Sequence, residues 1–298
     1  MKSNVIRTRL WDVSFSISNY FLLSLITFAC IYPFYYIFIY SLSDPIAAGG
    51  GLVFWPKGLN FDNYRRLLEL PNISSSFVVS VLRTVIGTIL TVFCCTLFAY
   101  IVTKRELPFR KFIYRFVVIT LYLNAGLIPW YLTMKSLGLK NNFLLYVIPG
   151  AIVGFYVILI KTFIEQLPAA LEESAMIDGA GYFTIFIKII FFLSLPIIAT
   201  IAVFAAVTQW NTWQDNFFLV SDPKLQTVQM VLYNYLNQVQ SIANMTIQEL
   251  NRGEAARQIT PQAVRMTMTM IVTIPILFVY PFLQRYFVKG LMLGAVKG

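Results

Sequence analysis

The sequence predicts an all-α membrane protein with six transmembrane helices. Hydrophobic residues make up 58% of the 298 residues and charged residues only 12%, whereas a soluble domain carries about 25% charged residues. The mean hydropathy is +0.71, and the apolar residues fall in long uninterrupted runs. Because a spanning helix needs roughly 20 apolar residues, these runs predict a bundle of helices in a lipid bilayer.

The apolar runs define six windows, each bounded by polar or charged residues. They cover residues 17–42, 77–102, 112–134 and 143–160, the stretch between Lys188 and Asp215, and the stretch between Arg265 and Arg285. The first window has no charged residue, and the second is interrupted only by Arg83. Six windows place both chain ends on the same side of the membrane.

Lysine and arginine predict the orientation. They concentrate in the segment before the first window, in the second connection and in the tail: Lys2, Arg7, Arg9, Lys104, Arg105, Arg110, Lys111, Arg285, Lys289 and Lys297. Cytoplasmic segments carry the excess of basic residues. We therefore expect residues 1–16 and 289–298 to be cytoplasmic ends of a transmembrane domain spanning 17–288, with extracellular loops at about 43–76 and 216–264.

The second of these loops contains an amphipathic stripe. Its apolar residues recur at three- and four-residue spacing: Leu225, Val228, Leu232, Tyr235 and Val239. This period is typical of a helix with one buried face. We expect a helix here that either caps the bundle or meets an external partner.

Several kinds of chemistry are excluded by the composition. The chain has no histidine, so histidine-based triads and zinc sites are ruled out. Cys30, Cys94 and Cys95 lie in apolar runs without metal-ligand spacing, and we expect them to be packing residues. No glycine-rich stretch has the pattern of a phosphate-binding P-loop. The net charge of +10 follows the positive-inside rule, so no nucleic acid partner, no metal and no catalytic residue is predicted.

The fourth connection breaks the charge rule, because it holds four acids against two lysines. Pro168 is tolerated in a first helical turn, and good helix formers follow it as far as Gly179, which stops the helix. The segment therefore predicts a short cytoplasmic helix at about 168–181. The small Ser174 and Ala175 would let another backbone approach, and Glu173 offers a carboxylate to an arginine. This pattern indicates a docking helix, and an ordinary solvated acidic face is the alternative.

A family resemblance begins at this segment. Glu173-Ser174-Ala175, with Gly179 and Ile189 after it, is similar to the EAA loop of the membrane subunits of ATP-binding cassette importers. The similarity extends to four other stretches: RTVIGT from Arg83, NAGLIPWYL from Asn124, LGLKNN from Leu137 and YPFLQRYFVKGLMLGAVKG from Tyr280. The chain resembles carbohydrate-uptake permeases related to the maltose system, particularly the branch that serves oligosaccharides and polysaccharide fragments.

This resemblance implies a transport function and a set of partners. A permease of this kind forms part of a sugar pathway that works by alternating access in the inner membrane of a bacterial cell. It assembles with a second homologous permease, two ATPase subunits and an extracellular or periplasmic sugar-binding protein. The chain itself would be no enzyme and would bind no cofactor, because ATP and magnesium belong to the ATPase.

The resemblance also implies two contacts with the ATPase. The first is the coupling helix, which carries Glu173, Ser174, Ala175, Asp178 and Gly179. The second is the tail, which would enter the interface between the ATPase subunits through Lys289, Gly290, Gly294, Lys297 and Gly298, unless it anchors the chain to the lipid surface. One departure concerns the bend into the fifth window, because Phe191-Phe192 stand where the motif usually has Leu-x-x or Leu-Pro. The effect of this departure is left open.

The sugar pathway itself has only weak signals. Aromatic faces suit sugar rings and Asn side chains can bond hydroxyl groups, which makes the following residues candidates: Asn124, Trp130, Tyr131, Trp210, Asn211 and Trp213. Trp and Tyr also form the interfacial belts of membrane proteins, and the substrate pocket could lie in the partner permease. The identity of the sugar is not indicated.

Other functions and other roles remain as alternatives. An ion-coupled secondary transporter usually needs acids embedded in the membrane, and no Asp or Glu lies inside the six windows. A membrane enzyme lacks a convergent catalytic set. Arg83 would be costly if it faced lipid, so it either extends to the outer surface or turns toward protein. Gly150 and Gly154 form a small-xxx-small pair that favours helix packing.

Overall fold

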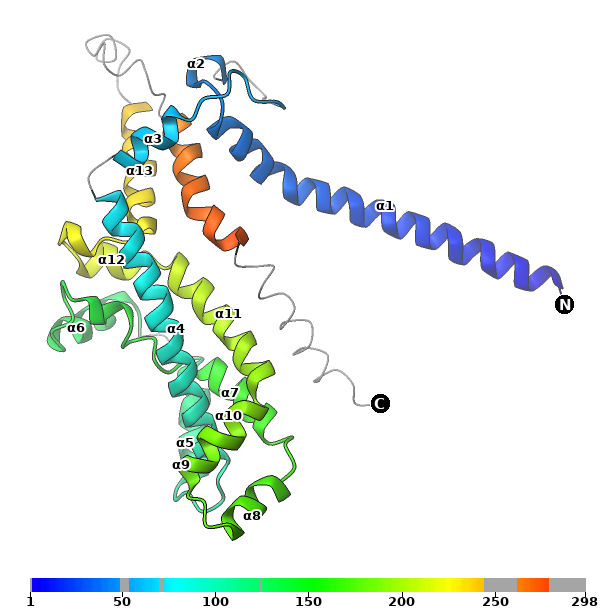
Figure 1. The fold of residues 1–298 in the computed structure, drawn as a ribbon, viewed down its shortest axis with the longest axis vertical. Coiled ribbons are helices and arrows are strands. Elements are labelled where there is room, and N and C mark those ends of the chain that lie inside the picture. The colour runs from blue at the N-terminus through cyan, green and yellow to red at the C-terminus, as the bar shows by residue number, and fades with distance from the viewer. Residues whose placement is uncertain (1, 49–53, 70–71, 124, 244–261, 279–298) are drawn as a thin grey trace. The chain divides into compact units, whose positions relative to one another are not determined.

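The computed structural model of the chain describes residues 2–48, 54–69, 72–123, 125–243 and 262–278 (Figure 1). Within these residues the regular structure is helical, and the extended pairing is limited to an isolated antiparallel bridge between Ser43 and Leu59. The all-α fold predicted from the sequence is thus confirmed. The chain divides into two compact units, which are described separately. One comprises Met1–Glu69 and Tyr235–Ile271, and the other Leu70–Asn234 and Val272–Gly298.

The first unit is dominated by one long helix. It contains α1 (Lys2–Ser41), α2 (Pro45–Ala48) and α3 (Asp62–Glu69), together with the second part of α13 (Val228–Ala243) and the first part of the helix Gln262–Phe278. The segment Asp12–Ser41 has 30 residues and contains an 18-residue window with a mean hydropathy of 2.0, so it is long and apolar enough to cross a membrane. Phe15, Tyr20 and Phe28 are each at least 70% exposed, so α1 presents apolar side chains that lipid or another protein chain would cover.

The end of α1 is held by the segment that follows it. The Ser41 and Tyr64 hydroxyls form a hydrogen bond of 2.6 Å, and the Asn63 amide donates to the Ser43 carbonyl at 3.4 Å. Burial raises the pKa of the Tyr64 phenol above its ordinary value. The region expected as an external loop at 43–76 therefore contains the helices α2 and α3 and the start of α4.

The core of the second unit is built on three helices. They are α4 (Ile73–Thr103), α7 (Gly154–Ile164) and α11 (Leu195–Asn211). The α4 helix has 31 residues and contains an 18-residue window with a mean hydropathy of 2.3, of which 44% is buried. It packs along both α7 and α11 (Figure 1). Side chains that are completely buried fill the space between these helices and the α9 region: Cys95, Ala99, Val157, Ile160, Ile185, Phe186 and Ile201.

Close packing in this core depends on one of the predicted small residues. A Cβ atom added to Gly154 would lie 3.0 Å from a methyl group of Leu121 and 3.2 Å from the Val117 carbonyl oxygen. Glycine therefore lets the start of α7 approach the end of α5 (Arg110–Thr120). The packing role expected for Gly154 is confirmed. Cys95 is a packing residue as well, with its sulfur 3.3 Å from the Val153 amide that donates to it.

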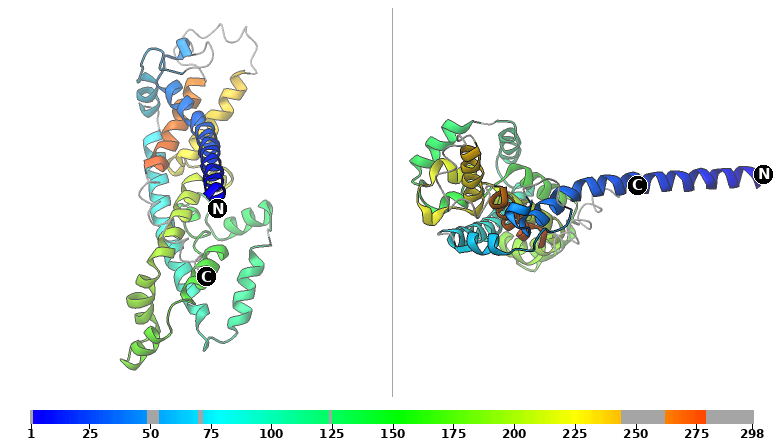
Figure 2. Two further views of the ribbon diagram at one scale, coloured as in Figure 1. Left: turned by 90° about the vertical axis from the view of Figure 1, so that its right-hand side faces the viewer. Right: turned by 90° about the horizontal axis from the view of Figure 1, so that it is seen from above.

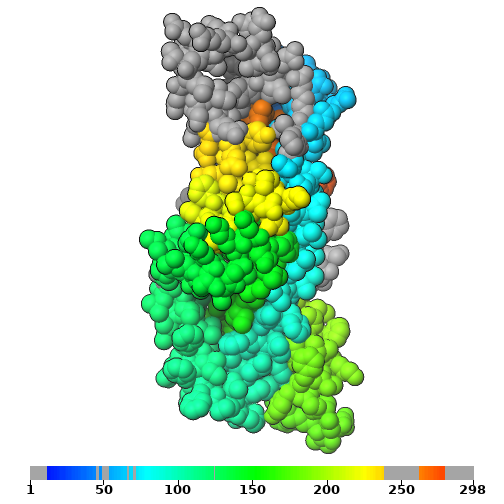
Figure 3. All heavy atoms as spheres, turned by 90° about the vertical axis from the view of Figure 1, so that its left-hand side faces the viewer, coloured from blue at the N-terminus to red at the C-terminus, as the bar shows by residue number. Residues whose placement is uncertain are grey.

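Two of the apolar windows do not form single helices. The third, residues 112–134, divides into α5 and α6 (Leu127–Ser136), and Gly126 between them has φ +82°. The fourth, residues 143–160, divides into the short η1 (Phe143–Tyr146) and α7. In the view of Figure 3, the green segment from α6 to η1 lies between α5 (blue-green) and α12 (yellow).

The fifth window is bent rather than straight. It belongs to a bent pair of helical segments that begins before the window. The first segment contains α9 (Tyr182–Ile185), a π-helical turn η2 (Phe186–Ile190) and α10 (Phe191–Leu193), and the second is α11. The two segments meet at 81° around Ser194. Pro196 has no N–H to bond the carbonyl four residues before it, which weakens the helix at this point. The bend is thus present with Phe191-Phe192 in the sequence, and Phe191 packs edge-on against Phe186.

The segment after the fifth window is helical too. It contains α12 (Gln214–Leu219), η3 (Pro223–Leu225) and α13 (Val228–Ala243), followed after a gap by the helix Gln262–Phe278. The amphipathic helix predicted from the stripe is confirmed as α13, and Val228 is fully buried. In the described residues two helices, α1 and α4, are each long and apolar enough to cross a membrane, and the bent pair would make a third span.

Candidate functional site

The helix α8 (Ala170–Ile177) occupies the position of the predicted docking helix (Figure 1). Glu172 and Glu173 lie in its first turn, where carboxylates interact favourably with the helix dipole. After Asp178 the chain reverses at Gly179, which has φ +82°, and the Ala180 amide donates to the Ala175 carbonyl at 2.9 Å. Glycine adopts this backbone conformation without strain, so it ends the helix where the sequence indicated.

The two adjacent glutamates of α8 face different ways. Glu172 points into the protein, where its carboxylate pairs with Lys104, while Glu173 is exposed. Ala175 is partly buried against the core on the same inner side as Glu172, whereas Ile177 is 86% exposed. Glu172 is therefore not part of an ordinary solvated acidic face. The outer face of α8 combines a carboxylate with apolar side chains, which is a composition suited to docking.

Lys104 lies at the end of α4 and contacts three side chains. Its ammonium group pairs with the Glu172 carboxylate, and only 15% and 19% of the two side chains are exposed. The same nitrogen lies 4.0 Å from the centre of the Tyr100 ring and 6.0 Å from that of Tyr182. In the sequence Lys104 served only as one basic residue of a cytoplasmic connection. The 68 positions that separate it from Glu172 leave no local pattern that would reveal the pair.

A second polar cluster surrounds Arg83 in the interior of the unit. The Arg83 guanidinium binds both carboxylate oxygens of Asp215, at 2.6 and 3.1 Å. It also donates to the Gln209 side chain at 3.0 Å and to the Thr212 carbonyl at 2.9 Å. Arg83 is only 3% exposed. The structure thus decides between the two interpretations of Arg83, because the side chain is buried and turns toward protein.

The Arg83 cluster joins several helices. The guanidinium carbon lies 4.7 Å from the centre of the Tyr146 ring. The Tyr146 hydroxyl donates to the Leu225 carbonyl at 2.6 Å and accepts a hydrogen bond from Asn216. The cluster therefore connects α4, η1, α11, α12 and η3. The sequence had a usable signal, since an arginine within an apolar window requires an acid and Asp215 ends another window, but Asp215 was treated there only as a boundary.

Gln209 reaches this cluster because a glycine gives it room. A Cβ atom on Gly87 would lie 2.6 Å from the Gln209 amide nitrogen, and one on Gly150 would lie 3.4 Å from it. Any side chain at position 87 would therefore displace the amide that bonds Arg83. A Cβ atom on Gly150 would make only an ordinary van der Waals contact with Gln209. Gly150 therefore does not allow the close approach of helices that Gly154 allows.

Trp210, Asn211 and Trp213 gather at the end of α11. Asn211 donates to the Val207 carbonyl at 2.9 Å and accepts from Gln229 at 3.1 Å. The Trp213 ring stacks on Tyr233 with centroids 4.2 Å apart. Trp210 is 7% exposed, and its indole N–H donates to the Val272 carbonyl at 3.1 Å.

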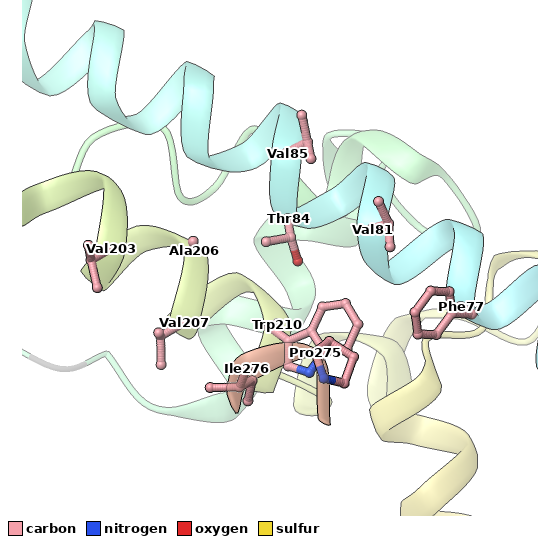
Figure 4. Close-up of a pocket in the computed structure, with 10 residues that line it drawn as sticks. All are labelled: Phe77, Val81, Thr84, Val85, Val203, Ala206, Val207, Trp210, Pro275 and Ile276. Atoms are coloured by element: carbon pink, nitrogen blue, oxygen red, sulfur yellow. The ribbon is translucent and has the colours of Figure 1, made fainter. Parts of the chain in front are cut away.

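The pocket beside Trp210 is apolar (Figure 4). Its volume is about 240 Å³, and α4, α11 and the last helix supply its lining: Phe77, Val81, Thr84, Val85, Val203, Ala206, Val207, Trp210, Pro275 and Ile276. Apart from the Thr84 hydroxyl and the Trp210 indole, these side chains carry no hydrogen-bonding group. Sugar hydroxyls would lose their hydrogen bonds here, so the pocket suits hydrocarbon rather than sugar.

The remaining candidates for the pathway lie elsewhere. Trp130 and Tyr131 of α6 pack against a cluster of Leu139, Leu145 and Leu219. Asn124 and the five tail residues fall outside the described residues. The structure therefore groups three of the six pathway candidates and sets two apart from them, and sugar contact stays a prediction for all six.

Comparison with known proteins gives the family. No protein-family model matches the chain. It is 35% identical to the polygalacturonan/rhamnogalacturonan transport system permease protein YtcP of Bacillus subtilis, covering 98% of this chain and 100% of that protein. It is also 35% identical to the protein LplC of Bacillus subtilis, over 95% of each chain.

Two further comparisons concern a permease from another organism and a solved structure. The trehalose/maltose transport system permease protein MalG of Thermococcus litoralis is 26% identical over 92% of this chain and 94% of that protein. A chain in the crystal structure of a bacterial ABC transporter that imports the acidic polysaccharide alginate aligns with a TM-score of 0.83 and 28% identity, covering 93% of this chain and 97% of that chain. With its all-helical fold, this chain belongs to the permease subunits of ATP-binding cassette sugar importers.

Proposed function

We propose that this permease subunit imports fragments of an acidic polysaccharide. The observation that carries the proposal is that two full-length similarities, to the polygalacturonan/rhamnogalacturonan permease and to the alginate importer, concern polymers of sugar acids. Together with a second homologous permease, the chain would line a pathway that opens alternately to the two sides of the membrane. Asn124, Trp130, Tyr131, Trp210, Asn211 and Trp213 are the candidates in this subunit for contact with the sugar.

The proposed topology has six spans with both termini in the cytoplasm of the bacterial cell. The distribution of lysine and arginine supports it, and so do the apolar lengths of α1, α4 and the bent pair that ends in α11. The broken third and fourth windows would each count as one span, because non-helical backbone is tolerated at membrane depth where protein buries it. The second permease and lipid would cover the exposed apolar side chains of α1.

In this proposal α8 is the coupling helix. It is supported by the exposure of Glu173 and Ser174 beside Ile177, on a helix that lies at the opposite end of its unit from α12 (Figures 1 and 2). An ATPase subunit would receive this face, with Asp178 and Gly179 closing the turn and Ala175 packing inward. ATP and magnesium would bind in that ATPase, and the tail residues Lys289, Gly290, Gly294, Lys297 and Gly298 would reach the interface between the two ATPase subunits.

Reconstituted vesicles test the proposal. The complete complex, with partner permease, ATPase and extracellular binding protein, should take up a labelled trigalacturonate only when ATP is present. Raffinose serves as the neutral control and should be taken up much more slowly. Faster uptake of raffinose would contradict the acidic substrate. Uptake by this chain alone, driven by an ion gradient, would instead favour a secondary transporter.

A further inference from the structure

We propose that Lys104 is a positioning residue that ties the coupling helix to the longest buried helix of the unit. In this role the Lys104–Glu172 pair makes the cytoplasmic end of α4 follow the movement of α8. The inference rests on the proposed function, because it assigns to α8 the contact with the ATPase. It adds the internal route by which movement of α8 would reach the spans.

The pair provides a connection that the chain itself does not. Through its own backbone α8 is joined only to its sequence neighbours, α7 before it and α9 after it. Lys104 comes from a different part of the chain and meets Glu172 in the first turn of α8. The main packing partners of α4 near this end are α7 and the η2 region, and Ala175 of α8 packs against the core that α4 helps to form, so the pair adds a polar link to this packing.

The surroundings of the pair favour a firm connection. Both side chains are mostly buried, and the Tyr100 and Tyr182 rings lie beside the ammonium group. A cation close to an aromatic face is attracted to it, more strongly when water is excluded. Two separate attractions therefore restrain the Lys104 ammonium, one from α8 and one from the aromatic rings.

The helix α4 is suited to carry the movement further. Its 31 residues are unbroken, and it packs along α7 and α11. From Lys104 it extends about 30 Å, at 1.5 Å per residue, to Arg83 and the cluster at the end of α11. A displacement of α8 would thus reach the elements that hold Trp210, Asn211 and Trp213, which are candidates for the pathway.

The test uses three variants in the complete reconstituted complex. Lys104→Met removes the charge and keeps much of the apolar stem, whereas Lys104→Arg keeps the charge. Glu165→Gln is the matched control, because Glu165 pairs with Lys161 four residues before it at the end of α7, and this pair does not connect α4 with α8. For each variant we would measure the amount of assembled complex, the basal ATP hydrolysis, and the sugar transported per ATP hydrolysed.

We expect Lys104→Met to retain the ATPase and its basal hydrolysis but to transport about fivefold less sugar per ATP, the lower end of the coupling between linked sites. Lys104→Arg should restore most of this ratio, and Glu165→Gln should leave it unchanged. An unchanged ratio in Lys104→Met would overturn the inference. An equal loss of assembled complex in Lys104→Met and Lys104→Arg would also overturn it, because that result would mean that Lys104 is needed for folding and not for coupling.

A fourth variant separates this inference from the assignment of α8. Ile177→Asp places a charge on the exposed face of α8 and should release the ATPase. If Ile177→Asp keeps the ATPase bound and transport normal, the assignment of the coupling helix fails. If it releases the ATPase while Lys104→Met transports normally, only the role of Lys104 fails.

Discussion

The buried pair between Arg83 and Asp215 allows a quantitative prediction. Asp215→Asn keeps the size of the side chain and removes its charge. Arg83 would then lose its charged partner but keep its hydrogen bonds to Gln209 and Thr212, at 3.0 and 2.9 Å. Since Arg83 is 3% exposed, water cannot replace the carboxylate. Leaving a buried charge without its partner costs about 3–5 kcal/mol.

A double-mutant cycle isolates the pair. Arg83→Met leaves Asp215 with its hydrogen bond from the Asn216 amide and should also cost about 3–5 kcal/mol. Arg83→Met combined with Asp215→Leu removes both charges and should be far less destabilised than the sum of the two single changes, because no buried charge remains. The exposed pair Arg65–Glu69, with side chains 78% and 63% exposed, is the control. Arg65→Met should cost less than about 1 kcal/mol.

The measurement is the free energy of unfolding of the purified subunit in detergent, followed by tryptophan fluorescence during denaturant titration. The single Asp215→Asn change should shift the midpoint strongly, while Arg65→Met leaves it nearly in place. Two results would refute the reasoning. One is an Asp215→Asn variant as stable as the Arg65→Met control, and the other is a double variant whose loss equals the sum of the single losses.

Three further predictions follow from the described contacts and the tail. Gly87→Val places a side chain within 2.6 Å of the Gln209 amide, so we expect a loss of about 1–3 kcal/mol, typical of overpacking; the same titration measures it, and a stability equal to that of the unchanged chain would contradict the close approach. Glu173→Arg reverses the exposed carboxylate of α8 and should lower the amount of ATPase that copurifies with the complex, whereas unchanged copurification in high and low salt would argue against an ionic contact. Deletion of residues 291–298 should leave assembly intact and reduce ATP hydrolysis stimulated by the loaded binding protein; full stimulation would favour a lipid anchor.

The sequence predicted where helices form better than it predicted where the apolar windows are broken. Apolar length and the stripe of Val228 and Tyr235 predicted α4 and α13, since both depend on local composition. The division of the third and fourth windows escaped prediction because a window counts hydrophobicity and not backbone geometry. Gly126 lies within the third window, yet only the structure shows its positive φ.

For the candidate sites, too, the sequence predicted what depends on local residues and not the contacts between distant residues. The docking helix was predicted at about 168–181 and forms at Ala170–Ile177, because Gly179 is a local stop signal. The Arg83–Asp215 and Lys104–Glu172 pairs join residues 132 and 68 positions apart. For the first pair the sequence indicated only that Arg83 needs an acid, and for the second it gave no signal, because such contacts depend on how the helices pack.

The opposite directions of Glu172 and Glu173 make α8 sensitive to register. Consecutive residues on a helix are rotated by about 100°, so one inserted residue between Pro168 and Glu172 would turn a different side chain toward Lys104. Such an insertion would preserve the composition and charge of the segment while it moved a carboxylate from the inner side to the outer side. Changes of length in this connection should therefore be tolerated far less than exchanges of its exposed residues. Even an insertion close to a full helical turn would return Glu172 to the inner side but about 5.4 Å further along the helix axis.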